Sequence, residues 1–167
     1  IQSQDFELKG KWREGYFKNN NPIVLELGCG KGEYTVGLAK KYPNKNFIGI
    51  DIKGARLWRG CKTAFEDKMS NVAFLRTHIQ LLEKFFDKGE VDEIWITFCD
   101  PQPNNENRRL TCERFLNRYA QVMKPDGVLH LKTDSKELFD YTFESLNQNN
   151  HGIIFATDDL YASDYEG

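Results

Sequence analysis

The chain has 167 residues, of which 40% are hydrophobic and 29% charged, and its net charge is −2 at pH 7. This composition fits one globular domain, and no apolar run approaches the roughly 18 residues that a membrane helix needs. The balance is not basic, so binding to nucleic acid would have to rely on a local patch. Four widely spaced cysteines form no CxxC pair, which indicates neither zinc nor a redox dithiol; we expect them to be buried and reduced in the cytoplasm.

Short β-branched runs alternate with amphipathic stretches along the first half of the chain. A strand is expected at 22–27, and a helix at 33–42 ends before a proline. A second strand at 46–52 leads to a helix at 55–69 that carries basic residues on part of its surface. A third strand follows at 71–77.

The second half continues the same alternation. A short helix is expected at 81–86, a fourth strand at 92–98 and a helix at 109–123, which a Lys-Pro-Asp-Gly turn closes. The remaining expected elements are a fifth strand at 127–133, a helix at 135–147 and a sixth strand at 152–157.

Strand–helix alternation of this regularity predicts an α/β fold with a single doubly wound, mostly parallel sheet and helices on both faces. We expect residues 1–20 to be an N-terminal extension and residues 21–167 to form the domain. Ligands of such sheets bind beyond the carboxyl ends of the strands. Polar or glycine residues follow five of the expected strands, at 28–32, 51–53, 77–79, 100–103 and 133–134.

The loop after the first strand has the pattern E-x-G-x-G-x-G, formed by Glu26, Gly28, Gly30 and Gly32. Glycines allow a sharp turn and let a ligand approach the backbone. A dinucleotide fold would show G-x-G-x-x-G, and here the third glycine comes one residue too early. A phosphate-binding P-loop would need Lys followed by Ser or Thr, but Lys31 is followed by glycine.

Asp51 closes the second strand and is placed to accept hydrogen bonds from both hydroxyls of a ribose. Both NAD and S-adenosylmethionine carry such a ribose, so Asp51 alone does not separate them. Glu26 beside the glycine loop suits a ligand with an ammonium and a sulfonium, and it suits a pyrophosphate poorly. The residues therefore favour S-adenosylmethionine as the cofactor.

The stretch NPIVLELGCGKGEYTVGLAKKYPNKNFIGIDIKGARLWRG resembles the first two motifs of the tRNA (guanine-N7)-methyltransferase family. The segments NVAFLRT, VDEIWITFCDPQP, RRLTCERFL and GVLHLKTDS resemble its later motifs in the same order. The resemblance implies a Rossmann-like class I methyltransferase fold. It also implies methyl transfer from S-adenosylmethionine to N7 of a guanosine in the tRNA variable loop, expected at tRNA position 46.

The resemblance also assigns site residues. Asp100 matches the family's central acid between cofactor and guanine, and we expect it to be the catalytic residue by positioning the base rather than by taking a proton. The expected cofactor-binding residues are Glu26, Gly28, Gly30, Asp51, Ile52, His78, Ile79 and Asp100. The expected tRNA-binding residues are Asn104, Arg108, Arg109 and Asp134.

Further cations are expected to contact tRNA phosphates, namely Lys53, Arg56, Arg59, Lys62 and Arg114. Two departures from the family pattern weaken the expected tRNA site. The family has a basic stretch where this chain has NNEN at 104–107, and the family's C-terminal T-x-Y-E motif is not matched, so the C-terminal part of the fold is expected to be incomplete.

Two other functions stay open. One is another S-adenosylmethionine-dependent RNA methyltransferase, and the other is a non-catalytic RNA-binding module on the same fold. The aromatic residue that amine methyltransferases place in N/D-P-P-Y/F is absent from DPQP. We expect tRNA as partner, a monomer or weak homodimer, and neither metal nor membrane binding.

Overall fold

A single parallel sheet organises the chain, of which the computed structural model describes residues 6–163. The strand order β3-β2-β1-β4-β5 places the switch point between β1 and β4, where the direction of winding reverses. The expected doubly wound α/β fold is therefore confirmed. The strands are β1 (Ile23–Leu27), β2 (Asn46–Asp51), β3 (Val72–Arg76), β4 (Val91–Thr97) and β5 (Met123–Lys132).

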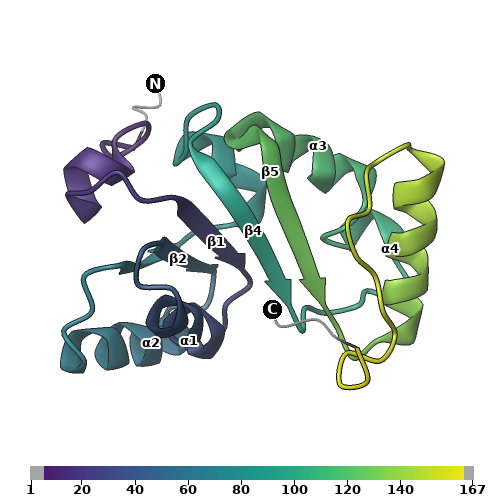
Figure 1. Cartoon of the computed structure of the whole chain (residues 1–167), viewed down its shortest axis with the longest axis horizontal. Coiled ribbons are helices and arrows are strands. Elements are labelled where there is room, and N and C mark those ends of the chain that lie inside the picture. The colour runs from purple at the N-terminus through teal and green to yellow at the C-terminus, as the bar shows by residue number, and fades with distance from the viewer. Residues whose placement is uncertain (1–5, 164–167) are drawn as a thin grey trace.

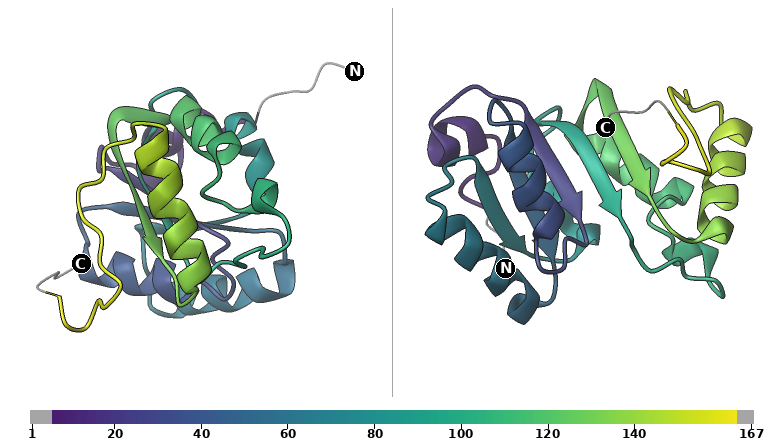
Figure 2. Two further views of the ribbon diagram at one scale, coloured as in Figure 1. Left: turned by 90° about the vertical axis from the view of Figure 1, so that its right-hand side faces the viewer. Right: turned by 60° about the horizontal axis from the view of Figure 1, so that its bottom comes forward.

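Helices lie on both faces of the sheet (Figure 1). One face carries α1 (Glu33–Lys41) and α2 (Gly54–Glu66), which pack on β2 and β3. The remaining elements are the π-helix η1 (Trp12–Phe17), the 3₁₀ helices η2 (Ile79–Lys84) and η3 (Glu106–Arg108), and the α-helices α3 (Glu113–Val122) and α4 (Lys136–Gln148). The α3 helix packs against β5 and η2, while α4 lies beyond β5 (Figure 2).

The central strands read as continuous apolar runs because both of their faces are covered. All five residues of β1 are buried, including Glu26. A larger core cluster lies between the sheet and the η2–α3 side, and a smaller one lies under α1 and α2. No helix among the described residues is long and apolar enough to cross a membrane.

Residues before β1 pack against the rest of the domain. Trp12 and Phe17 are buried, and the Trp12 ring stacks on Phe86 at a centroid distance of 5.5 Å. Arg13 forms an ion pair with Asp92 at 2.6 Å and donates to two backbone carbonyls. A domain boundary at residue 20 stays a prediction.

Three glycines surround the ring of Phe74 on β3. A Cβ at Gly32 would lie 2.5 Å from this ring, and one at Gly60 would lie equally close. A Cβ at Gly49 would come within 2.8 Å of it. The absence of side chains at these positions lets α1, α2 and β2 approach β3 closely.

Two predicted segments differ from the structure. Residues 152–157 do not form a strand, and Ile154 and Phe155 are 83% and 49% exposed. An apolar run becomes a strand only when its backbone pairs with a neighbour, and no described strand pairs with this one. The Lys-Pro-Asp-Gly segment falls within the bounds of β5 and interrupts its pairing with β4, since the register passes from Val91–Met123 to Glu93–Val128.

The helices α1 and α2 leave part of their face of the sheet open. In Figure 1, β4 and β5 face the viewer without a helix in front of them. Trp95 on β4 and His130 on β5 stack there at a centroid distance of 4.1 Å, and both are partly exposed. Trp95 therefore lies on a half-buried sheet surface, where it packs against the smaller core cluster.

Candidate active site

A cavity of about 480 Å³ opens at the carboxyl ends of the strands, a size typical of small-molecule sites. Loops after β1, β2, β3 and β4 contribute to it. Of the expected site residues, Gly28, Asp51, Ile52, His78, Ile79 and Arg108 line this cavity.

The loop after β1 turns through three glycines in the left-handed region, where other residues are strained. The φ angles are 72° at Gly28, 56° at Gly30 and 73° at Gly32. A Cβ at Gly28 or Gly30 would meet no described atom within 4 Å, whereas at Gly32 it would strike Phe74. The first two glycines thus border open space, and the third also serves packing.

Asp51 fixes the shape of two loops at once. Its Oδ2 accepts a hydrogen bond from the Gly30 N–H at 2.9 Å, and its Oδ1 accepts one from the Lys53 N–H at 2.8 Å. The carboxylate is only partly buried and also lines the cavity. A ligand that binds there meets an acceptor held in place by the backbone.

Glu26 occupies a different environment from Asp51. It is 4% exposed, and its two carboxylate oxygens accept hydrogen bonds from the hydroxyls of Thr35 and Thr97. Burial raises the pKa of this carboxyl above its ordinary value, the two threonines lower it, and Asp51 adds to the rise. Glu26 does not line the cavity, so it lies behind the glycine loop and ties β1 to α1 and β4.

The loop after β4 carries Asp100 in a constrained backbone. Phe98 and Gln102 have φ angles of 47° and 49°, which are left-handed values at non-glycine residues. The exposed Asp100 accepts the Gln102 N–H through Oδ1 at 2.9 Å. Gln102 lines the cavity, whereas Asp100, to which it is hydrogen-bonded, is not among the lining residues.

The thiols near the site are unsuited to nucleophilic chemistry. Burial raises the pKa of Cys99 to about 11, and burial also raises the pKa of Cys29. All four cysteines are unpaired, and Cys61 is exposed rather than buried as expected. Within residues 6–163, no group of three or more His, Cys, Asp or Glu side chains is placed to hold a metal ion.

The expected tRNA-binding residues differ in how exposed they are. Asn104, Arg108 and Asp134 are exposed, and Arg108 lines the cavity. Arg109 is only 3% exposed, and its guanidinium is engaged by protein groups. Arg109 therefore has no surface to offer a phosphate, which corrects the expectation that both arginines of the pair contact tRNA.

Sequence reasoning had not assigned several cavity residues to the cofactor. Thr77 follows β3 directly and belongs to the segment 77–79, one of those expected to face a ligand because they follow a strand. Leu110 comes from the segment that leads into α3 and Phe115 from α3 itself, where no polar signal marks them. The other unassigned lining residues are Gln80, Gln102 and Arg114.

A basic surface lies on α2. Lys53, Arg56, Arg59 and Lys62 are all exposed, and no acidic residue lies in the first turn of this helix. Trp58 is 64% exposed, and the Lys62 ammonium lies 5.4 Å from its ring centroid.

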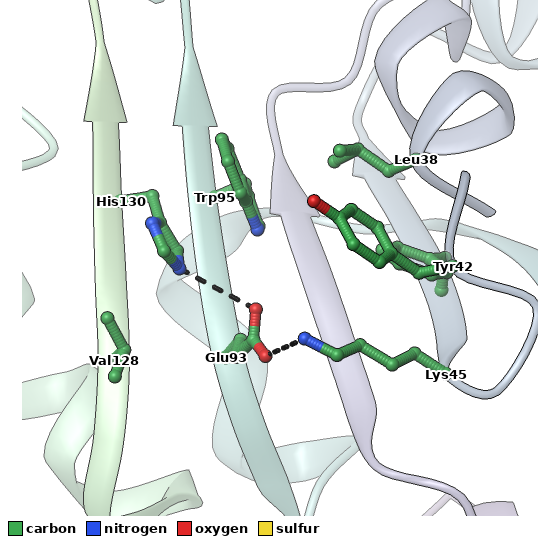
Figure 3. A pocket seen from close by; sticks show the side chains of 8 residues that line it. Leu38, Tyr42, Lys45, Glu93, Trp95, Val128 and His130 are labelled. Atoms are coloured by element: carbon green, nitrogen blue, oxygen red, sulfur yellow. Dashed lines mark hydrogen bonds and ion pairs between the residues drawn. The ribbon is translucent and has the colours of Figure 1, made fainter. Parts of the chain in front are cut away.

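A second cavity of about 260 Å³ lies on the open β4–β5 face, away from the expected site residues. Figure 3 shows Glu93 between the His130 ring and Lys45. Hydrogen bonding from His130, together with Lys45, lowers the pKa of Glu93 to about 2 despite partial burial. This polar cluster helps to hold the neighbouring strands together.

A family model described as "Putative methyltransferase" matches residues 20–164. A tRNA (guanine-N(7)-)-methyltransferase of Christiangramia forsetii is 59% identical over 162 residues, which are 96% of this chain and 72% of that protein. The chain belongs to the tRNA (guanine-N7)-methyltransferase family. Enzymes of the same name from Porphyromonas gingivalis and Bacteroides thetaiotaomicron are 56% and 52% identical, with 66% and 65% of their length covered.

Solved structures support the fold of this family member. An antibiotic-related methyltransferase superposes with a TM-score of 0.63 at 21% identity, covering 87% of this chain and 77% of the other. The YcgJ protein of Bacillus subtilis gives a TM-score of 0.55 at 20% identity, with 77% and 52% covered. The chain thus shares the class I methyltransferase fold, and it spans about two-thirds to three-quarters of its curated relatives' length.

Proposed function

We propose that this chain carries the catalytic site of a tRNA (guanine-N7)-methyltransferase. It would transfer a methyl group from S-adenosylmethionine to N7 of a guanosine in the tRNA variable loop. The observation that carries the proposal is the single cavity that gathers Gly28, Asp51 and His78 from the ends of three strands, in a chain 59% identical to an enzyme of that name.

The residues around the cavity fit S-adenosylmethionine. Gly28 and Gly30 leave open space where a Cβ would stand, so a ligand can approach the backbone. Asp51 offers its carboxylate to the ribose hydroxyls from a fixed position. Ile52 and Ile79 would pack against the adenine, and His78 would hydrogen-bond it.

The proposed role of Glu26 differs from direct contact. Because both of its oxygens already accept threonine hydroxyls, it would support the glycine loop from behind and contribute negative potential. That potential favours a cationic cofactor over a pyrophosphate.

The proposed reaction requires no proton transfer to or from the protein in the methylation step. Bound S-adenosylmethionine would supply an electrophilic methyl group on its sulfonium. Guanine N7 carries an in-plane lone pair and no proton, so the displacement needs no general base. The protein's task is to hold N7 in line with the methyl group, and positioning of this kind accounts for much of the rate.

Asp100 would perform the positioning. Its Oδ1 holds the Gln102 N–H, and Oδ2 has no hydrogen-bond partner among residues 6–163. The carboxylate can accept from N1–H and the exocyclic amine of guanine. It would also stabilise the positive charge that the ring acquires on methylation.

Exposed cations on both sides of the cavity would hold the tRNA backbone. Lys53 directly precedes α2 and Arg56 and Arg59 lie on it, while Arg108 and Arg114 line the cavity. Asn104 and Asp134 are exposed and would contact the substrate near the base. Phosphate contacts of this kind give affinity that falls with salt.

Incubation of the full-length protein with unmodified tRNA and labelled S-adenosylmethionine tests the proposal. We expect one labelled base, 7-methylguanine, in the variable loop. Methyl on another atom or RNA would favour a different RNA methyltransferase. Tight tRNA binding with no cofactor binding in calorimetry would favour the non-catalytic module.

The setting of the reaction is part of the same proposal. We infer a cytoplasmic protein, in which four unpaired thiols are compatible with a reducing compartment. We also infer a monomer or weak homodimer, which sedimentation of the full-length protein would test.

A further inference from the structure

Arg109 is a buried charge with partners from three elements. Its Nε donates to the Pro101 carbonyl at 3.1 Å, and its Nη2 donates to Glu137 on α4. The guanidinium also lies 4.4 Å from the ring centroid of Tyr141 on α4, and its Nη1 lies 3.9 Å from Glu106 on η3. Burial of a charge is costly, so this set of partners is what keeps the guanidinium in place.

One of those partners belongs to a loop with strained backbone. Phe98 and Gln102 both adopt left-handed φ values, and Pro101 lies between them. Such conformations cost about 1–3 kcal/mol each and persist only where surrounding contacts impose them. The bond from Arg109 to the Pro101 carbonyl is such a contact, one residue from Asp100.

The other main partner follows Asp134 closely. The α4 helix begins at Lys136, and its cap residue Ser135 accepts the Leu138 N–H at 3.2 Å. Glu137 therefore stands in the first turn, three residues after Asp134. A second buried link joins the segment just after Arg109 to the middle of α4, since the Thr111 and Thr142 hydroxyls lie 2.7 Å apart.

We propose that Arg109 is a positioning residue that couples the loop carrying Asp100 to the start of α4, and thereby sets Asp100 and Asp134 relative to each other. This inference rests on the proposed function for its catalytic consequence. Its structural content, the coupling of two segments through one guanidinium, can be tested without turnover.

The planar guanidinium is required because the partners lie in different directions. Nε and Nη2 donate to separate acceptors while the face covers Tyr141. A lysine ammonium retains the charge but cannot reproduce this fork and its stacking. Methionine keeps much of the length and loses all of the hydrogen bonds.

The test uses the full-length protein with Arg109→Met, Arg109→Lys and a control, Arg13→Met. Arg13 is a matched arginine at the opposite end of the sheet, where it donates to the Asn21 and Glu90 carbonyls and pairs with Asp92. Hydrogen exchange is measured over 98–111 and 133–139, and kcat, KM for tRNA and the cofactor Kd are measured beside it.

We expect Arg109→Met to speed exchange in both segments and to lower kcat by about 10- to 100-fold. The KM for tRNA and its salt dependence should change less than about threefold, because a buried guanidinium contacts no phosphate. Arg109→Lys should recover only part of kcat. Arg13→Met should lower stability and leave exchange in both segments unchanged.

Three results would overturn the proposal. Faster exchange in only one segment would mean that the two are not coupled through Arg109. A weaker salt dependence with unchanged kcat would make Arg109 a phosphate contact. An Arg109→Met variant with wild-type exchange and kcat would leave it no positioning role. If the wild-type protein does not methylate tRNA, the proposed function fails, whereas the exchange result still decides the coupling.

Discussion

Asp51 illustrates how one carboxylate can serve the backbone and a ligand together. Both oxygens accept backbone N–H groups from different loops, which fixes the carboxylate before any ligand arrives. A group held this way loses little freedom on binding, and preorganisation of this kind favours affinity.

Asp51→Asn should weaken cofactor binding by about 10- to 100-fold, because the amide has one acceptor where the carboxylate has two and carries no charge. Calorimetry with S-adenosylmethionine measures the change. Asp87→Asn is a matched control, since Asp87 also accepts a backbone N–H, from Lys88, far from the cavity. Equal affinities in the wild type and Asp51→Asn would remove Asp51 from the cofactor site.

Glu26 yields a prediction of how the stability of the protein depends on pH. Burial raises its folded pKa, so the folded state disfavours ionisation relative to the unfolded chain. Stability associated with Glu26 is therefore present below the unfolded pKa of about 4.3 and is lost as pH rises through the folded pKa. Glu26→Gln should gain stability relative to wild type as the pH rises above about 4.3, as followed by urea denaturation. A wild type that gains relative to the variant over this range would contradict the raised pKa.

At the scale of elements, two helical glycines distinguish the effect of packing on stability from the effect of helix propensity. A Cβ added at Gly60 on α2 would lie 2.5 Å from the Phe74 ring, whereas one added at Gly37 on α1 would meet nothing within 4 Å. The two substitutions to alanine should therefore act in opposite directions.

Gly60→Ala should destabilise the protein by about 1–3 kcal/mol through overpacking. Gly37→Ala, the matched control, should stabilise it by about 0.5–1 kcal/mol because alanine favours the helix. Chemical denaturation midpoints measure both. Destabilisation by both variants would show that the contact with Phe74 is not what distinguishes them.

The strand pair β4–β5 supplies a further pH prediction. The pKa of Glu93 is lowered to about 2 by hydrogen bonding from His130 and by Lys45, so its stabilising effect is present above the unfolded pKa of about 4.3 and fades as pH falls toward 2. Glu93→Gln should cost about 1–2 kcal/mol at pH 6 and progressively less below pH 4. The exposed Glu144→Gln is the control. A cost that persists unchanged at pH 2.5 would point to packing rather than charge.

Most elements could be predicted from the sequence, because periodicity and breakers report local backbone preference. The five paired strands and the loops after them follow the predicted order. The prediction of a sixth strand at 152–157 is wrong, because strand formation depends on a pairing partner that periodicity does not reveal. The burial of Arg109 could not be predicted either. Arg108 and Arg109 are chemically identical, and only the tertiary structure buries Arg109 while it leaves Arg108 exposed.

At the scale of the whole molecule, a net charge of −2 coexists with a cationic face on α2. A net negative charge does not favour RNA binding, so the proposed affinity for tRNA would come from this local surface and the arginines near the cavity. The local contribution can be measured through salt dependence.

The double variant Arg56→Ala with Arg59→Ala should reduce the slope of log affinity for tRNA against log salt by about 1.4–1.8, the loss of two phosphate contacts. Filter binding or fluorescence at several salt concentrations measures it. Lys84→Ala with Lys88→Ala removes two exposed lysines at and after the end of η2 and should leave the slope unchanged. Equal slopes for the wild type and the α2 variant would exclude this face from the binding surface.

The ring of Phe74 links positions that are distant in sequence, since Gly32, Gly49 and Gly60 all pack against it. These four positions form one steric unit, so relatives should exchange residues there in concert. A smaller residue at 74 would relieve the closest contact of a Cβ at 60, but a Cβ at 49 would still lie 2.8 Å from Thr35 Oγ1. The φ of 73° keeps glycine favoured at 32. Gly32, the last glycine of the loop motif, is therefore constrained by a helix–sheet contact as well as by the proposed ligand.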